Sequence, residues 1–387
     1  MYDDPQMDQS KNLEKKMKDL NVRQSELIKT MRFPLIVLVL FEHSVRPYNA
    51  PMQWSFNGAN VFHFFSEMIS HFFCPIAVAW FFYFSGFLFY HNLQEGQFGK
   101  QWAMQKWYRR FHSVLIPHLF WNLFNVLIVL LVTFLFDLIG LVPNSDQMEL
   151  VRKGPLYWFI TGPIDFPLWY LRNLIVMSIL APVFYYPVKK WPWISLAVIL
   201  ALYLVSFKVE FFLFPTFSLF GMGAWMSIRK DNIVAFCRTL KYPAAIIALI
   251  LLPTATFFYG GDYSYDRFFR LLFIPSGMIT FLNICDKLYE LDGYRKLMLR
   301  LTETVFFIYA AHEIYILGWT KGMFIRIFGE TLAARWISYL FVPVVTGAIC
   351  LGLFYLLKHI MPKTLSFACG WRTVHKETYN KYNKANP

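Results

Sequence analysis

The first apolar segment, "MRFPLIVLVLFEHS", carries ionisable side chains where a membrane span would have hydrocarbon-soluble ones. Arg32 and His43 are eleven positions apart, so at about 100° and 1.5 Å per residue a helix would place them within about 20° on one face and about 16 Å apart along its axis. Glu42 would point about 100° away from His43. Histidine can accept a proton near neutral pH, so the pattern predicts a proton-transfer site within the membrane. The alternatives are an anchoring Arg32, a packed His43 and an interfacial Glu42.

A basic cluster comes directly before the third apolar run, in "KWYRRFHSVLIPHLFWN". It consists of Lys106, Arg109, Arg110 and His112. The forked guanidinium of arginine matches phosphate oxygens, so the cluster would suit a phosphate-bearing cofactor. Positive charge on the cytoplasmic flank of a span explains the same residues equally well. Charge alone leaves both interpretations open.

Two further pairs of residues could bind a polar substrate. Trp169 and Arg172, in "GPIDFPLWYLRNLIV", share a helix face at i and i+3, and the indole offers a flat surface on which a sugar could stack. The alternative for Arg172 is a side chain that reaches lipid phosphate. His312 and Glu313, in "FFIYAAHEIYI", predict a water-accessible cavity, with a satisfied hydrogen bond between helices as the alternative.

Membrane-spanning helices must position these residues. Of the 387 residues, 57% are hydrophobic and only 16% are charged, which is not the composition of a soluble protein. Apolar runs near the roughly 20 residues that a bilayer requires recur along the chain. The sequence therefore predicts an all-α polytopic membrane protein with about ten transmembrane helices in one bundle. The predicted spans are 31–49, 72–91, 114–137, 168–187, 192–207, 210–228, 243–259, 268–286, 302–320 and 336–358.

The distribution of Lys and Arg predicts the orientation of these spans. With a cytoplasmic N-terminus, the cytoplasmic segments carry 27 of these residues and the opposite side carries 8. Because cytoplasmic loops are enriched in Lys and Arg, we expect both termini to be cytoplasmic. The net charge of +13 then reflects orientation and predicts no nucleic-acid partner. Residues 1–30 lack a signal peptide and predict an amphipathic surface helix with Leu13, Met17, Leu20 and Leu27 on one side.

Three other patterns have structural interpretations. On a helix His63 and His71 would lie about 12 Å apart along the axis, too far to share one metal ion, and only a His63–Glu67 pair with a third ligand elsewhere stays open. The five cysteines are scattered without a CxxC pair, so neither a disulfide framework nor a zinc site is expected. Ser85-Gly86, inside "FFYFSGFLFY", predicts close helix packing.

Five segments, in order along the chain, resemble the acyltransferase-3 family of integral-membrane proteins, which O-acylate cell-surface carbohydrates. Arg32 and His43 look like its Arg-x10-His motif, and "FFYFSGFL" is similar to its second-span signature. "YRRFHSVLIPHLFWN" resembles its basic entry to the third span, "PLWYLRNLIV" its Trp-aromatic-Leu-Arg segment and "FFIYAAHE" its late His-Glu segment. The predicted number of spans also agrees with the family. In one departure, His112-Ser113 stand where the family often repeats a basic residue.

The resemblance implies that an acyl group, often acetyl, passes from cytoplasmic acyl-CoA to a hydroxyl of an extracytoplasmic glycan. It implies a multi-pass protein of the bacterial inner (cytoplasmic) membrane, in contact with lipid and without a metal. The expected parts are a leader (1–30), an acyltransferase domain (31–362) and a cytoplasmic tail (363–387). The expected site residues fall into three groups: catalytic (His43, Arg32, Glu42), acyl-CoA binding (Arg109, Arg110, Lys106) and glycan binding (Trp169, Arg172, His312, Glu313).

In such a reaction His43 would take the proton of the acceptor hydroxyl. Arg32 would orient the donor or stabilise the developing oxyanion. Glu42 would hold the imidazole of another residue or form part of a proton path. Arg172 is expected on the acceptor side of the cavity that holds His43.

Two alternatives come from other classes of protein. Buried charges in ten spans would equally suit a transporter or flippase of glycan intermediates, or a small-molecule sensor. Transporters often carry paired broken helices in an internal repeat, and the sequence shows no such repeat.

Overall fold

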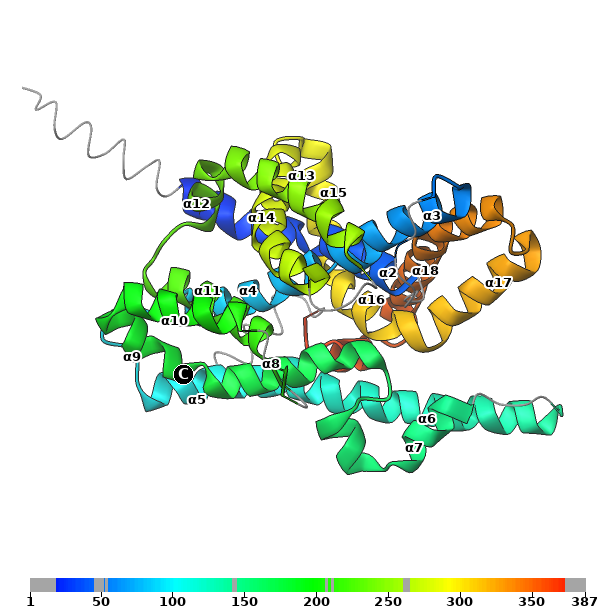
Figure 1. Ribbon diagram of the computed structural model, residues 1–387. Coiled ribbons are helices and arrows are strands. Elements are labelled where there is room, and N and C mark those ends of the chain that lie inside the picture. The colour runs from blue at the N-terminus through cyan, green and yellow to red at the C-terminus, as the bar shows by residue number, and fades with distance from the viewer. Residues whose placement is uncertain are drawn as a thin grey trace, which may run out of the picture. The chain divides into compact units, whose positions relative to one another are not determined.

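The computed structural model describes residues 19–44, 52, 55–140, 145–205, 208–209, 212–259 and 265–372, which are mostly helical (Figure 1). Leu13 and Met17 of the predicted leader, residues 45–49 of the first predicted span and the tail beyond 372 lie outside the described residues. The chain divides into two compact units, each built from three stretches of sequence. Unit 1 takes its described residues from Met1–His91, Tyr186–Leu200 and Leu219–Thr302, and unit 2 from Asn92–Tyr185, Ala201–Ser218 and Glu303–Pro387.

Unit 1 contains the first helices of the chain and a group from its middle. Residues 19–30 form a helix that continues through a turn at Met31 into the next one. The further elements are α2 (Arg32–Ser44), α3 (Gly58–Glu67), the π-helix η1 (Met68–Phe73), α4 (Ile76–Tyr90), α12 (Ile233–Thr239), α13 (Lys241–Phe257), α14 (Tyr265–Leu288) and α15 (Asp292–Leu301). Boundaries between the units fall within three helices, α9 (Pro182–Lys190), α10 (Pro192–Leu204) and α11 (Phe214–Ile228).

Unit 2 contains the longest single α-helix described. Its elements are α5 (Lys100–Arg110), the π-helix η2 (Phe111–Leu115), α6 (Ile116–Leu138), α7 (Ser145–Arg152), the π-helix η3 (Tyr157–Thr161), the 3₁₀-helix η4 (Phe166–Leu168), α8 (Trp169–Leu180), the antiparallel two-residue strands β1 (Lys208–Val209) and β2 (Phe212–Leu213), α16 (Val305–Ala311), the π-helix η6 (His312–Leu317), α17 (Gly318–Phe328), α18 (Leu332–Ile360) and α19 (Pro362–Ala368). The 3₁₀-helix η5 (Thr302–Thr304) begins at the boundary with unit 1.

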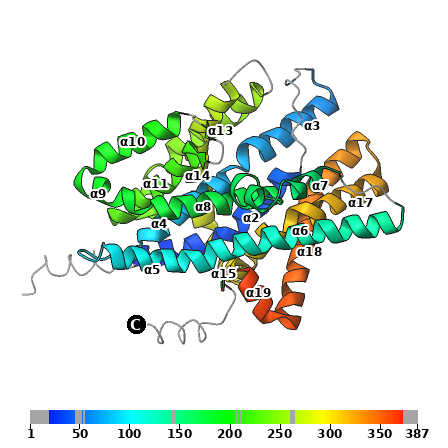
Figure 2. The ribbon, with the colours of Figure 1, turned by 90° about the horizontal axis from the view of Figure 1, so that it is seen from below.

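Capping residues determine where several helices begin and end. The side chains of Asn57, Asn232 and Thr331 each accept a hydrogen bond from the backbone N–H three residues later, at the starts of α3, α12 and α18. These side chains satisfy backbone donors that have no partner within the helix. Gly329 ends α17 with a φ of 75°, a conformation that a residue with a side chain adopts with strain. Only Glu330 separates Gly329 from Thr331, the residue that caps the start of α18. Because the connection is so short, α17 and α18 lie side by side (Figures 1 and 2).

Four continuous helical stretches of the described chain are long and apolar enough to cross a membrane. They are Gly58–Tyr90, Lys100–Leu138, Tyr265–Leu288 and Leu332–Ile360. The count rises to six if each of two bent pairs is one span: Phe166–Leu180 with Pro182–Lys190, bent by 54°, and Ile233–Thr239 with Lys241–Phe257, bent by 71°. The four long stretches contain most of the second, third, eighth and tenth predicted spans, so the polytopic helical class is confirmed.

The full set of ten predicted spans is not confirmed. The first corresponds to α2, which has 13 residues, and the sixth to α11, which has 15, against the roughly 20 that a bilayer requires. The fifth corresponds to the short apolar helix Pro192–Leu204. The ninth is interrupted, because η6 separates α16 from α17. Hydropathy measures how apolar a segment is, and it does not register where a helix bends or changes its winding.

Close packing of α4 against α11 confirms the interpretation of Ser85-Gly86. A Cβ on Gly86 would overlap the backbone carbonyl oxygen of Phe220, and one on Gly223 would overlap that of Tyr83. The two helices therefore meet backbone to backbone at a reciprocal pair of glycines, as small residues permit in membrane proteins. Within unit 1, the indole of Trp80 also donates to a carbonyl of α14, at 3.2 Å.

The helix before α2 is held by a buried carboxylate. Asp286, which is 6% exposed at the end of α14, accepts from Arg23 Nε at 2.6 Å and from Arg238 Nε at 2.7 Å. Next to Arg23 in the sequence, Gln24 Oε1 accepts a hydrogen bond from the backbone N–H of Ile233 at 2.6 Å. The segment that leads into Arg32 is thereby joined to the end of α14 and the start of α12.

Candidate active site

Arg32 and His43 lie at the two ends of the face that α2 buries. Four residues of this helix are buried: Leu35, Ile36, Val39 and Leu40. At about 100° per residue their mean direction is within about 10° of both Arg32 and His43. The expected common face therefore coincides with the buried face of α2, and within unit 1 this helix packs on η1 and α4. Both ionisable side chains are half-buried.

A hydrogen bond from η1 holds the end of α2 that carries His43. The last carbonyls of a helix lack an intrahelical partner. Here the carbonyl of Phe41 accepts from the hydroxyls of Ser70 and Ser44, each at 2.8 Å. The backbone next to His43 is therefore tied to η1. Glu42, between Phe41 and His43, is half-buried and its Oε2 atom is enclosed.

Two of the three predicted acyl-CoA-binding residues share a cavity. Lys106 and Arg109, one turn apart on α5, line it together, and Arg110 is not among its lining residues. His112, at the position where the family often has a second basic residue, bonds through Nδ1 to the carbonyl of Tyr108 at 2.9 Å. Lys106 and Arg109 are therefore brought together at one cavity.

Arg172 has a structural task that the sequence does not reveal. Its Nη1 donates to the carbonyls of Thr161 and, at 3.3 Å, Ile160, and its Nε donates to Asn173 at 3.3 Å. Cations are favoured at the carbonyl end of a helix, and these carbonyls belong to the end of η3. Arg172 thus joins η3 to α8. Trp169, one turn earlier, is half-buried.

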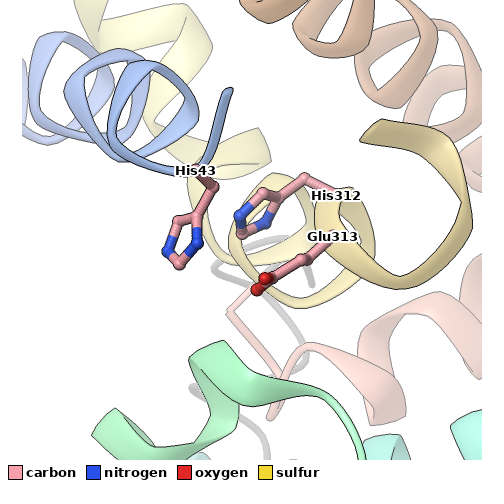
Figure 3. A group of neighbouring side chains, drawn as sticks. All are labelled: His43, His312 and Glu313. Carbon is pink, nitrogen blue, oxygen red and sulfur yellow. The ribbon is translucent and has the colours of Figure 1, made fainter. Parts of the chain in front are cut away.

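His312 and Glu313 occupy the first turn of η6. Figure 3 shows both side chains on this π-helix, together with His43 at the end of α2. His312 is fully buried, and its Nδ1 lies 2.9 Å from the carbonyl of Tyr309. π-Helical turns are frequent at functional sites because the extra residue displaces side chains from the regular helical positions. His43 belongs to unit 1 and the other two to unit 2, so a cavity shared by His43 and Arg172 stays a prediction.

Three polar residues near this π-helix are absent from the sequence-based set. Asp165 is 1% exposed, and burial together with the charge of Glu313 raises its pKa well above the usual value for an aspartate. His118 and Asn122, both buried on α6, hold the segment before Asp165: His118 Nε2 lies 3.2 Å from the carbonyl of Phe159, and Asn122 Oδ1 accepts from the backbone of Ile164 at 3.2 Å.

These three residues, together with Arg172 and Glu313, form a polar region of unit 2 around residues 159–165. The hydroxyl of Tyr309, on the helix before His312, donates to the carbonyl of Pro167, next to η4 and α8. The burial of Asp165 has only a weak signal in the sequence, because a carboxylate in a loop is normally solvated. Only the apolar neighbours of Asp165 indicate burial.

Together, the apolar helices and the buried ionisable groups among them define a multi-pass membrane protein with polar sites in its interior. The chain belongs to the acyltransferase-3 family, since the family model, described as an acyltransferase domain, matches residues 27–356. The resemblance drawn from the five motifs is therefore confirmed, and a membrane acyltransferase activity follows from the family. No curated protein and no solved structure matches the chain.

Proposed function

We propose that this protein moves an acetyl group from acetyl-CoA to a hydroxyl of an extracytoplasmic glycan. The observation that carries the proposal is the joint placement of Arg32 and His43 on the buried face of α2. Ionisable groups are costly within a bilayer and mark functional sites there. In a chain of this family, a half-buried imidazole that is tied to η1 suits a general base.

In the proposed reaction His43 accepts the proton of the acceptor hydroxyl as its oxygen attacks the thioester carbonyl. The C–O bond forms, and the carbonyl oxygen becomes an oxyanion. When the tetrahedral intermediate collapses, the C–S bond breaks and the CoA thiolate leaves. The imidazolium of His43 then returns the proton to that thiolate, so the products are the glycan ester and CoA. No acyl-enzyme is required.

The spacing in α2 favours a role for Arg32 in binding the donor. A general base and an oxyanion donor must each lie about 3 Å from the atoms that they serve. Arg32 and His43 are about 16 Å apart along α2, too far to serve the same carbonyl. Of the two roles that the sequence leaves open for Arg32, orientation of the long acyl-CoA molecule is therefore favoured. Lys106 and Arg109 would bind its phosphates, with Arg110 as a further cation nearby.

The acceptor side of the proposal rests on the polar region of unit 2. Trp169 supplies an aromatic surface, and Glu313, which follows His312 in η6, is close enough to the buried Asp165 for its charge to help raise the pKa of that carboxyl. A carboxyl whose pKa is raised well above its usual value can keep its proton and donate a hydrogen bond to a sugar oxygen. Arg172 holds η3 through two of its backbone carbonyls. In the proposal, the remaining N–H groups of its guanidinium donate hydrogen bonds to the glycan.

The proposal includes ten crossings, cytoplasmic termini and a bacterial inner-membrane location. Contacts within unit 1 support the predicted sidedness. Three segments predicted on the cytoplasmic side are the helix at 19–30, the region around 232–238 and the region after α14. Side-chain hydrogen bonds join them, including Arg23 and Arg238 to Asp286, and Thr302 Oγ1 to the carbonyl of Lys29 at 2.8 Å.

The activity can be tested with the purified full chain in lipid nanodiscs and acetyl-CoA that carries a radiolabelled acetyl group. We expect label to move to an added glycan, or to be released slowly by hydrolysis, and His43→Ala to abolish both. A transporter or a sensor would leave the thioester intact under the same conditions. Intact acetyl-CoA with every acceptor tried would contradict an acyltransferase.

A further inference from the structure

A cavity of about 260 Å³ lies in unit 2 at the start of the long helix that contains α5 and α6. Basic residues that only anchor a helix at the membrane surface would not be expected to share a cavity with such residues, because the cavity walls combine one aromatic ring, two cations and three amides. The lining residues are Asn92, Gln97, Trp102, Gln105, Lys106 and Arg109. This section of the chain is predicted to be cytoplasmic, which is the side from which acyl-CoA arrives.

The helical periodicity of α5 forms one wall of this cavity. Trp102, Gln105, Lys106 and Arg109 stand at i, i+3, i+4 and i+7, so they follow one face of the helix. Asn92 and Gln97 contribute from the segment that precedes α5. Anchoring charge requires no such alignment with an aromatic residue and amides.

The aromatic ring in the cavity packs against a second ring, which is itself stacked on a third. Phe98 stacks on Tyr185 with ring centroids 3.8 Å apart, and Trp102 lies against Phe98 at 5.4 Å. The Lys106 ammonium lies 5.3 Å from the centroid of the Trp102 ring. Three aromatic rings in contact, with a cation beside the last one, hold the indole in place. A ring fixed in this way can stack a planar ligand at little cost in conformational entropy.

The amides in the cavity have the chemistry that recognises the edge of a purine. Asn and Gln side chains can pair with the N6 and N7 atoms of adenine, donating one hydrogen bond and accepting another. Gln97 is held by Gln94, whose Oε1 accepts from Gln97 Nε2 at 3.1 Å. Its amide group is therefore oriented before any ligand arrives. A lipid headgroup has phosphate for Lys106 and Arg109 but no ring for Trp102.

We propose that this cavity binds the 3′-phosphoadenosine end of the acyl-CoA donor. The adenine stacks on Trp102, the amides contact its edge, and Lys106 and Arg109 bind the adjacent phosphates. A site for a whole drug-sized ligand has about 300–1,000 Å³, so a cavity of about 260 Å³ fits one end of the molecule and leaves the pantetheine arm outside. This inference rests on the proposed function, which names acyl-CoA as the donor.

The test compares Trp102→Ala, Trp102→Phe and the control Met104→Ala in the purified full chain. Met104 is also on α5, but it is 53% exposed and about 200° away from Trp102 around the helix. Stacking of a base on an aromatic side chain contributes about 1–3 kcal/mol, or roughly 5- to 150-fold in affinity. We expect Trp102→Ala to weaken CoA binding by at least about fivefold. Trp102→Phe, which keeps a ring, should recover part of the loss, and Met104→Ala should bind as the wild type does.

Donor truncation then separates the nucleotide from the thioester. With acetyl-CoA, Trp102→Ala should raise KM and leave kcat nearly unchanged, because stacking is equal in the ground and transition states. With acetyl-pantetheine, which lacks the nucleotide, the variant and the wild type should have the same KM. Arg109→Gln should reduce the preference for CoA over dephospho-CoA. Binding of vesicles that contain anionic lipid should not depend on Trp102.

The outcomes distinguish this inference from the proposed function. If the wild type transfers acetyl and Trp102→Ala leaves the KM for acetyl-CoA unchanged, the cavity assignment is wrong and the activity stands. If CoA binding depends on Trp102 but no donor is turned over, the activity is wrong and the cavity stands. A loss of vesicle binding in Trp102→Ala, with CoA binding intact, would instead assign the cavity to a lipid headgroup.

Discussion

Two of the ionisable residues of α2, Arg32 and His43, differ in what surrounds their backbone. Arg32 follows the helix that Asp286 holds through Arg23, and His43 lies between Phe41, whose carbonyl accepts from two serine hydroxyls, and Ser44, which supplies one of them. Each is therefore positioned by a separate polar contact within unit 1. Residues that do chemistry in an apolar environment need such support, because a small displacement lengthens the hydrogen bonds on which catalysis depends.

Replacement of His43 by Ala should abolish transfer while the protein still folds. General-base catalysis contributes about 10²–10⁴-fold, so the rate of acetyl transfer should fall by at least about 100-fold. Binding of CoA should remain, since the cavity on α5 is untouched. The measurement is label transfer from acetyl-CoA, and His359→Ala, which removes an exposed histidine from α18, is the matched control. Transfer near the wild-type rate in His43→Ala would remove this residue from the mechanism.

Replacement of Arg172 by Ala should impair the acceptor side selectively. The change removes the bonds to the carbonyls of η3, so the segment that leads to Asp165 loses a support. We expect the KM for the glycan to rise about tenfold or more, which corresponds to a loss of about 1.4 kcal/mol of binding free energy. The dissociation constant for CoA should change less than twofold. Arg172→Lys should recover little, because an ammonium cannot reproduce the forked geometry. Loss of CoA binding with intact acceptor affinity would show that donor and acceptor sides have been exchanged.

Among the helices, the contact of α4 with α11 makes the clearest prediction. Gly86→Ala places a methyl group against the carbonyl of Phe220, so the helices must separate. Overpacking costs about 1–3 kcal/mol, and the thermal midpoint in detergent should fall by several degrees. Gly352→Ala on α18 is the control, because no atom lies within 4 Å of the added Cβ, and alanine favours a helix over glycine by about 1 kcal/mol. Equal thermal midpoints for the two variants would contradict the close approach.

Sequence periodicity predicted some of these elements and missed others for identifiable reasons. Long apolar runs predicted α6 and α18, and small residues predicted the contact at Gly86, because these signals are local. The bends at 181 and 240 and the π-helix η6 were not predicted, although Pro182, directly after the first bend, is a local signal for a kink. The bonds of Arg172 were not predicted either, because their backbone acceptors at the end of η3 leave no pattern in the sequence. The common face of Arg32 and His43 was predictable because one helix determines it.

For the whole molecule, the prediction is an N-in, C-in topology with ten crossings. Reporter fusions near residues 100, 235 and 295 should give cytoplasmic signals, and fusions near 150 and 263 should give extracytoplasmic signals. The physical reason is the excess of Lys and Arg in the segments assigned to the cytoplasm. Fusions at residue 200, within α10, should be poorly expressed and serve as the control. An extracytoplasmic signal at 235 would show that an odd number of crossings, and not six, precedes that residue or that the orientation is reversed.

The partners of the N-terminal helix have a consequence for biosynthesis. Arg23 and Asp286 are 263 residues apart, and at about 5–20 residues per second a ribosome needs roughly 13 to 50 seconds to make the chain between them. During that interval the helix that leads into Arg32 has emerged, but the carboxylate that will hold it has not been made. The face of α2 that carries Arg32 and His43 can therefore complete its packing only late in synthesis. Nascent chains arrested before Asp286 should be cut readily by protease near residues 19–30, and chains released after Thr302 should be protected there.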